Sequence, residues 1–419
     1  MNSYIHLQRN ARISGQLTQL PASKSLSNRA LILKALSGGQ ATVSHLSAAR
    51  DTQLMQALVN SPAAVIDVMD AGTTMRFLTA YFAITNQKKI LTGTDRMKQR
   101  PIKLLVDALG QIGASIRYLE AEGFPPIEIL GFNGQAATHV DMPGNVSSQY
   151  ISALMMVAPI LPKGLNIHLH GETGSVPYIT MTAALMKDFG ADVSLDFQRQ
   201  LITVAPRAYQ PVSVTIEADW SAASYWFAFT ALAEEARFTL PRVSAKSLQG
   251  DRVIIDAMNH LGVAAQVTSD GLALSKKDSV SHLDWDFRDC PDLAQTILPV
   301  CAVKGVSGEF TGLESLRIKE TDRIAALQNE LKKIGAELNE PQTGHWHLTP
   351  GHLERLTAPI ATYHDHRMAM GFAPWATRTN LTIEDPAVVN KSYPGFWEDV
   401  ENVGIGVAVS NDARHSSKF

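Results

Sequence analysis

The stretch Pro21-Ala-Ser-Lys-Ser-Leu-Ser-Asn-Arg-Ala30 decides the fold, because it shows a kind of helix start that recurs along the chain. Ser23, Ser25 and Ser27 are the small hydroxyl residues that favour a helix N-terminus. Apolar residues then follow at helical spacing up to Leu36. The stretch therefore predicts a capped helix with one buried face.

Two cations flank this helix start. Lys24 and Arg29 lie beside free backbone N–H groups and the positive end of the helix dipole, a combination that suits an anion. Taken alone, the stretch favours an ordinary capped helix with surface cations slightly over an anion site. Gly38-Gly39 is expected to end the helix, and residues 41–46 to form a strand.

The same pattern occurs six times, which predicts an internal repeat. In each copy, polar residues precede an apolar helix, a strand follows, and a second helix comes next. The polar openings begin at Pro21, Asp70, Pro143, Asp219, Asp289 and Asp365, and the strands are expected around Val43, Leu91, Ile167, Phe238, Phe310 and Ile383. The second helices are expected to end at Gly113, Gly190, Gly262, Gly335 and, more weakly, Gly404. Both landmarks recur at intervals of about 70–77 residues, apart from one short interval after Val43.

A β-hairpin is expected between successive copies of the repeat. The hairpin patterns cover residues 115–130, 193–204, 264–274 and 336–348, and residues 4–17 fit the same position. The interval from Asp51 to Asp70 is too short for a hairpin and leaves only residues 63–68 as a strand.

Length and composition favour a globular protein of two domains. The chain has 419 residues, of which 45% are hydrophobic and 18% charged. A net charge of −3 gives no general attraction to nucleic acid or membranes, so any anion binding must be local. Two cysteines and an N-terminus without an apolar signal core favour a reducing, cytoplasmic location.

Each copy presents reactive or polar side chains where its first helix begins. They are Lys24, Ser25 and Arg29; Gly72 and Arg76; Ser147, Ser148 and Gln149; Asp219 and Ser221; Asp292; and Arg367. If the copies are related by approximate rotation, these helix N-termini could converge on a shared space. Such a space suits a small, highly anionic substrate better than a polymer.

Two stretches add cations near the starts of second helices. Taken alone, Arg100 before Pro101 is interpreted as a solvated surface charge. The run Arg317-Ile-Lys-Glu-Thr-Asp-Arg323 has two interpretations. It is either a charged helix start with Lys319 and Arg323 on one face, or a set of anion clamps beside an acid/base carboxylate.

Several kinds of site are not predicted. His364-Asp-His-Arg367 has no specific metal-ligand spacing and no partner cluster of His or Cys stands out, so no metal site is expected. Neither a P-loop nor a GxGxxG motif occurs, which argues against an ordinary nucleotide site. Cys290, at a helix start, is interpreted as a small buried residue rather than an activated thiol.

Six motifs in this chain resemble those of the 5-enolpyruvylshikimate-3-phosphate synthase family, the 3-phosphoshikimate 1-carboxyvinyltransferases. They are SKSLSNRALIL from Ser23, AGTTMRFLTA from Ala71, RMKQRPI from Arg96, SSQYISALMM from Ser147, RIKETDRI from Arg317 and DHRMAMGF from Asp365. The motifs occur in order, and the resemblance covers nearly the whole chain.

The resemblance implies an α/β fold of two domains, the inside-out α/β barrel of enolpyruvyl transferases. Each domain would consist of three βαβαββ-type units with pseudo-threefold symmetry. Residues 1–20 and 219–419 would form a discontinuous domain with both chain ends, and residues 21–218 an inserted middle domain. The active site would lie in the cleft between them.

The activity implied by the resemblance is transfer of the enolpyruvyl (carboxyvinyl) group of phosphoenolpyruvate to the 5-hydroxyl of shikimate 3-phosphate, with release of phosphate. This reaction belongs to the shikimate pathway to chorismate and aromatic amino acids. It would use no metal or organic cofactor, and its partners would be these two small polyanions. Family resemblance also favours a monomer.

Matching the motifs residue by residue implies roles for individual side chains. Asp292 would be the base on the 5-hydroxyl, and Glu320 would protonate the methylene carbon with assistance from Lys24. Shikimate 3-phosphate would be bound by Lys24, Ser25, Arg29, Ser147, Ser148, Ser175, Asp292, Ser315 and Lys319. Phosphoenolpyruvate would be bound by Lys24, Gly72, Arg100, Gln149, Arg323, Arg367 and Lys391. At Gly72, any side chain would block close approach to the backbone.

Three residues depart from the common family pattern. Asp70 and Ser315 stand where the family commonly has Asn, and Phe77 replaces a common Pro. The nearest alternative function is that of UDP-N-acetylglucosamine enolpyruvyl transferase, which usually carries a reactive Cys in a loop of the first domain; the corresponding residues 96–100 contain none. A non-catalytic repeat scaffold is the alternative from another class, and it gives no reason to gather these cations.

Overall fold

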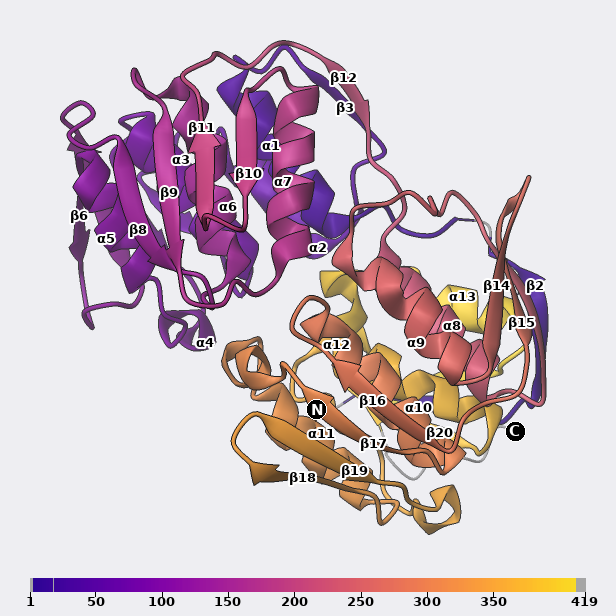
Figure 1. The fold of residues 1–419 in the computed structure, drawn as a ribbon. Coiled ribbons are helices and arrows are strands. Elements are labelled where there is room, and N and C mark those ends of the chain that lie inside the picture. The colour runs from indigo at the N-terminus through magenta and orange to yellow at the C-terminus, as the bar shows by residue number, and fades with distance from the viewer. Residues whose placement is uncertain (1–2, 18, 412–419) are drawn as a thin grey trace. The chain divides into compact units, whose positions relative to one another are not determined.

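The computed structural model describes residues 3–17 and 19–411 (Figure 1). The chain divides into two compact units. Unit 1 comprises Met1–Pro21 and Glu217–Phe419, and unit 2 comprises Ala22–Ile216. Each unit has its own hydrophobic core, so each is described by itself.

Unit 2 contains the first half of the repeat. Its helices are α1 (Lys24–Leu36), α2 (Arg50–Leu58), α3 (Gly72–Ile84), α4 (Asp95–Lys98), α5 (Lys103–Ile112), α6 (Ser148–Val157), the 3-10 turn η1 (Ala158–Ile160) and α7 (Val176–Asp188). Its strands are β3 (Thr42–Ser44), β4 (Val65–Asp67), β5 (Lys89–Thr92), β6 (Ala114–Tyr118), β7 (Ile127–Phe132), β8 (His139–Pro143), β9 (Leu165–His170), β10 (Val193–Asp196), β11 (Leu201–Val204) and β12 (Ser213–Thr215).

Unit 1 contains the second half. Its helices are α8 (Trp220–Leu232), α9 (Ile254–His260), α10 (Ala294–Lys304), α11 (Arg323–Lys332), α12 (His366–Phe372) and α13 (Phe396–Asn402). Its 3-10 turns are η2 (Gly250–Val253), η3 (Pro291–Leu293), η4 (Glu314–Ile318), η5 (Leu353–Arg355), η6 (Ala373–Thr377) and η7 (Pro386–Lys391). Its strands are β1 (Tyr4–Leu7), β2 (Arg12–Gln16), β13 (Glu235–Leu240), β14 (Val263–Thr268), β15 (Gly271–Lys276), β16 (His282–Asp286), β17 (Ser307–Thr311), β18 (Glu337–Gln342), β19 (His345–Thr349), β20 (Leu381–Glu384) and β21 (Val407–Ser410).

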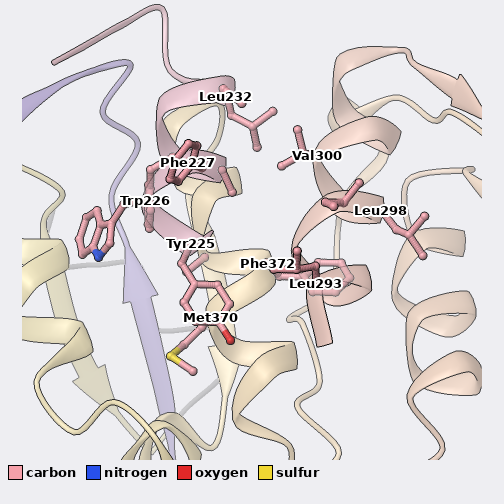
Figure 2. Close-up of a cluster of buried hydrophobic side chains, with 14 of the residues drawn as sticks. Tyr225, Trp226, Phe227, Leu232, Leu293, Leu298, Val300, Met370 and Phe372 are labelled. Atoms are coloured by element: carbon pink, nitrogen blue, oxygen red, sulfur yellow. The ribbon is translucent and has the colours of Figure 1, made fainter. Parts of the chain in front are cut away.

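The first helix of each copy lies in the core of its unit. Helices α3, α6, α8, α10 and α12 are buried along almost their whole length, because their sequences are apolar on every face. In unit 1, α8, α10 and α12 pack against one another. Figure 2 shows side chains from these helices, including Trp226, Leu298 and Phe372, gathered in one cluster.

The strands form open sheets with one buried and one exposed face. Residues of β7, β8 and β9 alternate between buried and exposed, as expected for strands with one face on the core. Because helices fill the centre and sheets lie outside them, each unit has the inside-out α/β arrangement. The described strands make separate sheets of two to four strands, and none of these sheets closes into a barrel.

Four of the sheets repeat one strand order, as the sequence period predicts. Each has a hairpin pair, then the strand that follows the first helix, then a parallel strand. The orders are β10-β11-β9-β8, β6-β7-β5-β4, β14-β15-β13-β2 and β18-β19-β17-β16. The glycines predicted to end the second helices all have positive φ, between 73° at Gly335 and 122° at Gly113.

The hairpin expected for residues 4–17 is wrong. Strand β1 pairs antiparallel with β20 and β21, whereas β2 pairs parallel with β13 in a different sheet. The physical reason is that β21 is the only strand after α13 among the residues up to 411 that the structure describes, and β1 takes the place of the second hairpin strand beside it. The two ends of the described chain therefore complete one repeat together.

The short interval in unit 2 behaves as the sequence predicts. Helix α2 leads to the single strand β4, which covers residues 65–67 of the expected 63–68. Strand β3 pairs only with β12, in a parallel two-stranded sheet. The first copy therefore has no hairpin on its sheet within the described residues.

Candidate functional site

In unit 1, three helix starts bring their charged residues together. Asp292 lies in η3, Arg323 is the first residue of α11 and Arg367 is the second residue of α12. The helix starts are fixed by side-chain caps: Asp322 accepts from Ala325 N at 3.0 Å, and Asp365 accepts from Arg367 N at 2.9 Å. The sequence therefore places both arginines in first turns, where their backbone is held by capping.

Asp292 is the common partner of these cations. Its Oδ1 accepts from Arg323 Nη1 at 2.7 Å, and its Oδ2 accepts from Arg367 Nη2 at 2.8 Å. Lys319 Nζ lies 3.9 Å from Oδ1. Burial raises the pKa of the Asp292 carboxyl, but Arg367, Lys319 and Arg323 outweigh burial and hold that pKa well below its ordinary value. Asp292 is therefore a firmly ionised carboxylate in this state.

Arg323 is enclosed by carboxylates. Its Nε donates to Asp365 Oδ2 at 2.7 Å and its Nη2 donates to Glu320 Oε2 at 2.9 Å, in addition to the bond with Asp292. The side chain is 2% exposed. Burial lowers the pKa of Arg323, but Asp365, Glu320 and Asp292 together raise it above its ordinary value. Carboxylates of the same unit therefore balance the charges of the two buried arginines, Arg323 and Arg367.

The predicted residues Asp292, Lys319, Glu320, Arg323 and Arg367 are thus brought together in unit 1. Their positions favour the interpretation of residues 317–323 as clamps beside a carboxylate over that of a solvated helix start. The expected pairing of Lys319 with Arg323 on one helix face is replaced by convergence on Asp292, because α11 begins only at Arg323.

Two further predicted residues of unit 1 lie in 3-10 turns. Lys391 is the last residue of η7 and is buried. Ser315 is exposed in η4, and no hydrogen bond or ion pair of the described residues joins it to Asp292. Its proposed contact with shikimate 3-phosphate therefore rests on the resemblance alone.

Unit 2 gathers cations in a different way. Lys24 Nζ lies 3.4 Å from the buried Asp51 Oδ2. Arg29 is 2% exposed and donates to Thr182 Oγ1 at 2.6 Å, Ser152 Oγ at 3.1 Å and the Ser25 carbonyl at 3.0 Å. Burial lowers the pKa of Arg29 to about 10. Neutral oxygens, rather than carboxylates, thus accept the hydrogen bonds of this guanidinium.

Gly72 and Arg100 lie close together. A Cβ atom at Gly72 would lie 2.7 Å from both Nη1 and Nη2 of Arg100. Arg100 is buried, and its Nε has no hydrogen-bond partner within the described part of the chain. Arg76, singled out in the sequence analysis, donates to the Pro101 carbonyl at 2.8 Å and so helps to hold the segment that contains Arg100.

The start of α6 lies beside the start of α3. Gln149 Nε2 donates to Thr73 Oγ1 at 3.2 Å. Ser147 is the N-cap of α6 and accepts from Gln149 N at 3.4 Å, and Ser148 is buried. Ser175 is the N-cap of α7 and has a φ of 55°, in the left-handed region. Within unit 2, the N-termini of two first helices, α3 and α6, thus lie next to each other.

Two of the three departures from the family pattern, Asp70 and Phe77, make contacts with nearby arginines. The Asp70 carboxylate accepts from Arg50 Nη2 at 2.7 Å, so a cation balances its charge. Phe77 is buried, and the Arg29 guanidinium lies 5.2 Å from its ring centroid.

Sequence reasoning missed two buried carboxylates, Asp51 and Asp251. Asp51 faces Lys24, and Asp251 Oδ2 accepts a hydrogen bond from Ser221 Oγ. Asp51 lies near the start of α2, and Asp251 lies in η2, which leads directly into α9. Aligning the starts of the second helices, and not only those of the first, would have marked both residues as the repeat's counterparts of Arg100, Ser175 and Arg323.

The described residues contain no group of three or more metal-ligating side chains. Cys290 and Cys301 are buried and free, and burial raises the pKa of each thiol to about 12. Cys290 is therefore the small buried residue that the sequence predicts. Among the helices described, none is long and apolar enough to cross a membrane.

Comparison with known proteins decides the family. The sequence model of EPSP synthase (3-phosphoshikimate 1-carboxyvinyltransferase) matches residues 7–61 and 55–400. A 3-phosphoshikimate 1-carboxyvinyltransferase of Bacteroides fragilis is 48% identical over 397 residues, which cover 94% of this chain and 96% of the relative. The chain belongs to the EPSP synthase family.

Other relatives agree with this assignment. The family member from Histophilus somni is 36% identical over 425 residues and covers 94% of this chain and 97% of its own. EPSP synthase from Acinetobacter baumannii has a similar structure, with a TM-score of 0.75 at 20% identity over 98% of this chain and all of the other. The enolpyruvyl transferase NikO from Streptomyces tendae gives a TM-score of 0.69 at 14% identity over 98% and 99% of the two chains. The fold is therefore that of the enolpyruvyl transferases.

Proposed function

We propose that this EPSP synthase family member transfers the carboxyvinyl group of phosphoenolpyruvate to the 5-hydroxyl of shikimate 3-phosphate and releases phosphate. The observation that carries the proposal is the Asp292 carboxylate held at 2.7 Å by Arg323 and at 2.8 Å by Arg367. It combines a candidate proton acceptor with cations that suit a carboxylate or phosphate. The shikimate pathway to chorismate and aromatic amino acids is the corresponding metabolic role.

In the proposed reaction, Asp292 accepts the proton of the 5-hydroxyl, and the hydroxyl oxygen attacks C2 of phosphoenolpyruvate. Glu320 protonates the methylene carbon, with assistance from Lys24, which gives a tetrahedral intermediate. Loss of a proton from the new methyl group and departure of phosphate then restore the double bond. The reaction as written needs only anion binding and proton transfer, so we propose no metal or organic cofactor.

The cations around Asp292 would control when this carboxylate can act as a base. A carboxylate whose pKa is held low by Arg367, Lys319 and Arg323 accepts a proton poorly. We propose that the anionic groups of phosphoenolpyruvate compete for Arg323 and Arg367, which weakens their hold on Asp292. The pKa of Asp292 then rises towards its ordinary value when the substrate is present.

The remaining binding roles follow the residue matches. Shikimate 3-phosphate is proposed to use Ser25, Arg29, Ser147, Ser148, Ser175, Ser315 and Lys319, and phosphoenolpyruvate to use Lys24, Gly72, Arg100, Gln149 and Lys391 together with the two arginines. Residues of both units thus serve one pair of substrates. Lys24→Ala in unit 2 and Asp292→Asn in unit 1 should therefore impair the same reaction.

A phosphate-release assay tests the proposal. Phosphoenolpyruvate is supplied with either shikimate 3-phosphate or UDP-N-acetylglucosamine, and we expect turnover with the first acceptor only. Residues 22–216 contain no cysteine, whereas the alternative enzyme usually uses one. Phosphate release with UDP-N-acetylglucosamine alone would overturn the proposal. We also propose a cytoplasmic monomer, and light scattering after size-exclusion chromatography checks its mass against 45.6 kDa.

A further inference from the structure

Asp251 is a buried carboxylate connected to the proposed site by one hydroxyl group. It lies in η2, packed against α8, and is 2% exposed. Ser221 Oγ donates to Asp251 Oδ2 and accepts from Arg367 Nη2 at 3.3 Å. These directions follow from chemistry, since a guanidinium can only donate. The same nitrogen of Arg367 lies 2.8 Å from Asp292 Oδ2.

We propose that Asp251, acting through Ser221, is a positioning residue that keeps Arg367 in place when phosphoenolpyruvate takes over the contact with Asp292. The inference rests on the proposed function. Arg367 Nη1 donates to the buried Tyr225 hydroxyl at 3.5 Å. Its Nη2 has two anchors that differ in accessibility: Asp292 has a side chain that is 17% exposed, whereas Asp251 lies behind Ser221. An incoming anion competes with the first anchor, and the second remains.

A purely structural role does not explain Asp251 well. Gln249 already fastens this segment to α8, because its Oε1 accepts from Trp220 N at 3.1 Å and its Nε2 donates to the Ala218 carbonyl at 2.8 Å. Asp251 Oδ1 is buried and has no hydrogen-bond partner in the described part of the chain. A half-satisfied buried carboxylate destabilises a fold, so its presence favours a function.

The surroundings of Asp251 make its charge sensitive to pH near neutrality. Burial raises the pKa of Asp251 to about 6; Arg367 opposes this shift, as does the Ser221 hydrogen bond, and the nearby Asp292 and Asp219 add to it. Cys290 from η3 also faces it, but that thiol has a pKa of about 12 and stays neutral. Above pH 6 the ionised Asp251 accepts the hydrogen bond from Ser221 and makes the Ser221 oxygen a stronger acceptor for Arg367. Below pH 6 the neutral acid no longer has this effect.

The test is Asp251→Asn, which keeps the shape and removes the charge. At pH 8 we expect the KM for phosphoenolpyruvate to rise about tenfold, with kcat within about threefold of the wild type. The ratio of wild-type to variant kcat/KM should fall towards one as pH decreases from 8 to 5, because the wild-type acid is then neutral as well. Substrate phosphates also titrate near pH 6, but they do so equally for both enzymes.

Ser221→Ala and the double variant test the path through the hydroxyl. If Asp251 acts through Ser221, the double variant should be no worse than the more impaired single variant. Independent, multiplying effects would contradict the path. Glu330→Gln is the matched control, since Glu330 is a buried carboxylate that accepts hydrogen bonds from Lys333 Nζ, the Ala361 backbone N–H and the Tyr363 hydroxyl, away from the site arginines. We expect it to leave the KM for phosphoenolpyruvate unchanged.

The melting temperature separates positioning from folding. Because the pKa of Asp251 is raised in the fold, its ionised form destabilises the protein above pH 4, so Asp251→Asn should melt at or above the wild-type temperature at pH 8. A variant with a lower melting temperature, a lower kcat and a higher KM would overturn the proposed positioning role. Kinetic constants within twofold of the wild type across the pH range would also overturn it. A wild type without turnover would overturn the proposed function instead.

Discussion

The two units hold their site arginines by different means. In unit 1, Arg323 donates to Asp292, Glu320 and Asp365, and Arg367 donates to Asp292. In unit 2, Arg29 donates to two hydroxyls and a carbonyl, and Arg100 packs against the backbone of Gly72. The arginines of unit 1 are thus neutralised by carboxylates, whereas those of unit 2 are held by neutral groups.

The difference gives the two units separate roles in the proposed function. Arginines held by neutral groups can receive an anion without giving up a carboxylate, so unit 2 would supply attraction. Arginines held by carboxylates would exchange one anion for another, so in the proposed reaction substrate binding at unit 1 would change the environment of Asp292. The chain keeps a net charge of −3 because these functions are local.

The largest expected effect comes from replacing Asp292, the unit 1 carboxylate that would lose its arginine contacts when substrate binds. Asp292→Asn removes the proton acceptor, so we expect kcat to fall at least about a hundredfold, the usual scale for an acid/base group. Calorimetric titration should show shikimate 3-phosphate binding within about threefold of the wild type. Asp289→Asn, an exposed change three residues earlier, is the control. Full turnover by Asp292→Asn would remove the proposed base.

The next effect compares one arginine from each unit. Arg323→Gln leaves Asp292, Glu320 and Asp365 facing one another without their shared cation, so it should destabilise unit 1 by roughly 3–5 kcal/mol. Arg100→Gln removes no carboxylate partner and should cost less than about 1 kcal/mol while raising the KM for phosphoenolpyruvate. Thermal unfolding and kinetics of both variants give the comparison. Equal loss of stability would show that the two units do not differ in this way.

Much of this arrangement could be predicted from residues alone. The period of polar openings, strands and helix-ending glycines predicted the repeat, because each copy must bury an apolar helix under a sheet. The motifs around Asp292, Arg323 and Arg367 predicted a charged cluster, which the structure shows. The hairpin at residues 4–17 failed, because strand pairing depends on which edge is vacant elsewhere in the fold.

The balance of charges could not be predicted from the sequence. Spacing shows that Asp365 precedes Arg367, but not that its carboxylate accepts from Arg323 on another helix at 2.7 Å. Aligning second-helix starts could have pointed to Asp251, but not to its contact with Ser221, which depends on the packing of η2 against α8. Ion pairs between residues far apart in the sequence decide which cations are neutralised. A local sequence pattern does not show these pairs.

A smaller effect tests the contact that unit 2 makes without a carboxylate. Gly72→Ala places a Cβ where the Arg100 guanidinium now lies, and the flexible end of that side chain can move away. We therefore expect little change in melting temperature but an increase of about tenfold in the KM for phosphoenolpyruvate, from misplacing one guanidinium. Gly110→Ala on the exposed side of α5, where a Cβ meets nothing within 4 Å, is the control. An unchanged KM for Gly72→Ala would mean that Arg100 does not bind this substrate.

The smallest expected effect concerns the one carboxylate beside Gly72. Asp70 replaces the family's common Asn, and its carboxylate is 28% exposed and paired with Arg50 at 2.7 Å. A partly exposed pair of this kind contributes about 0–1 kcal/mol, and the pairing already offsets the negative charge. Asp70→Asn should therefore change the KM for phosphoenolpyruvate by less than about twofold, and a change of that size should disappear at high salt. A large, salt-independent fall in KM would instead show that Asp70 repels the substrate, and that unit 2 contains an unbalanced carboxylate after all.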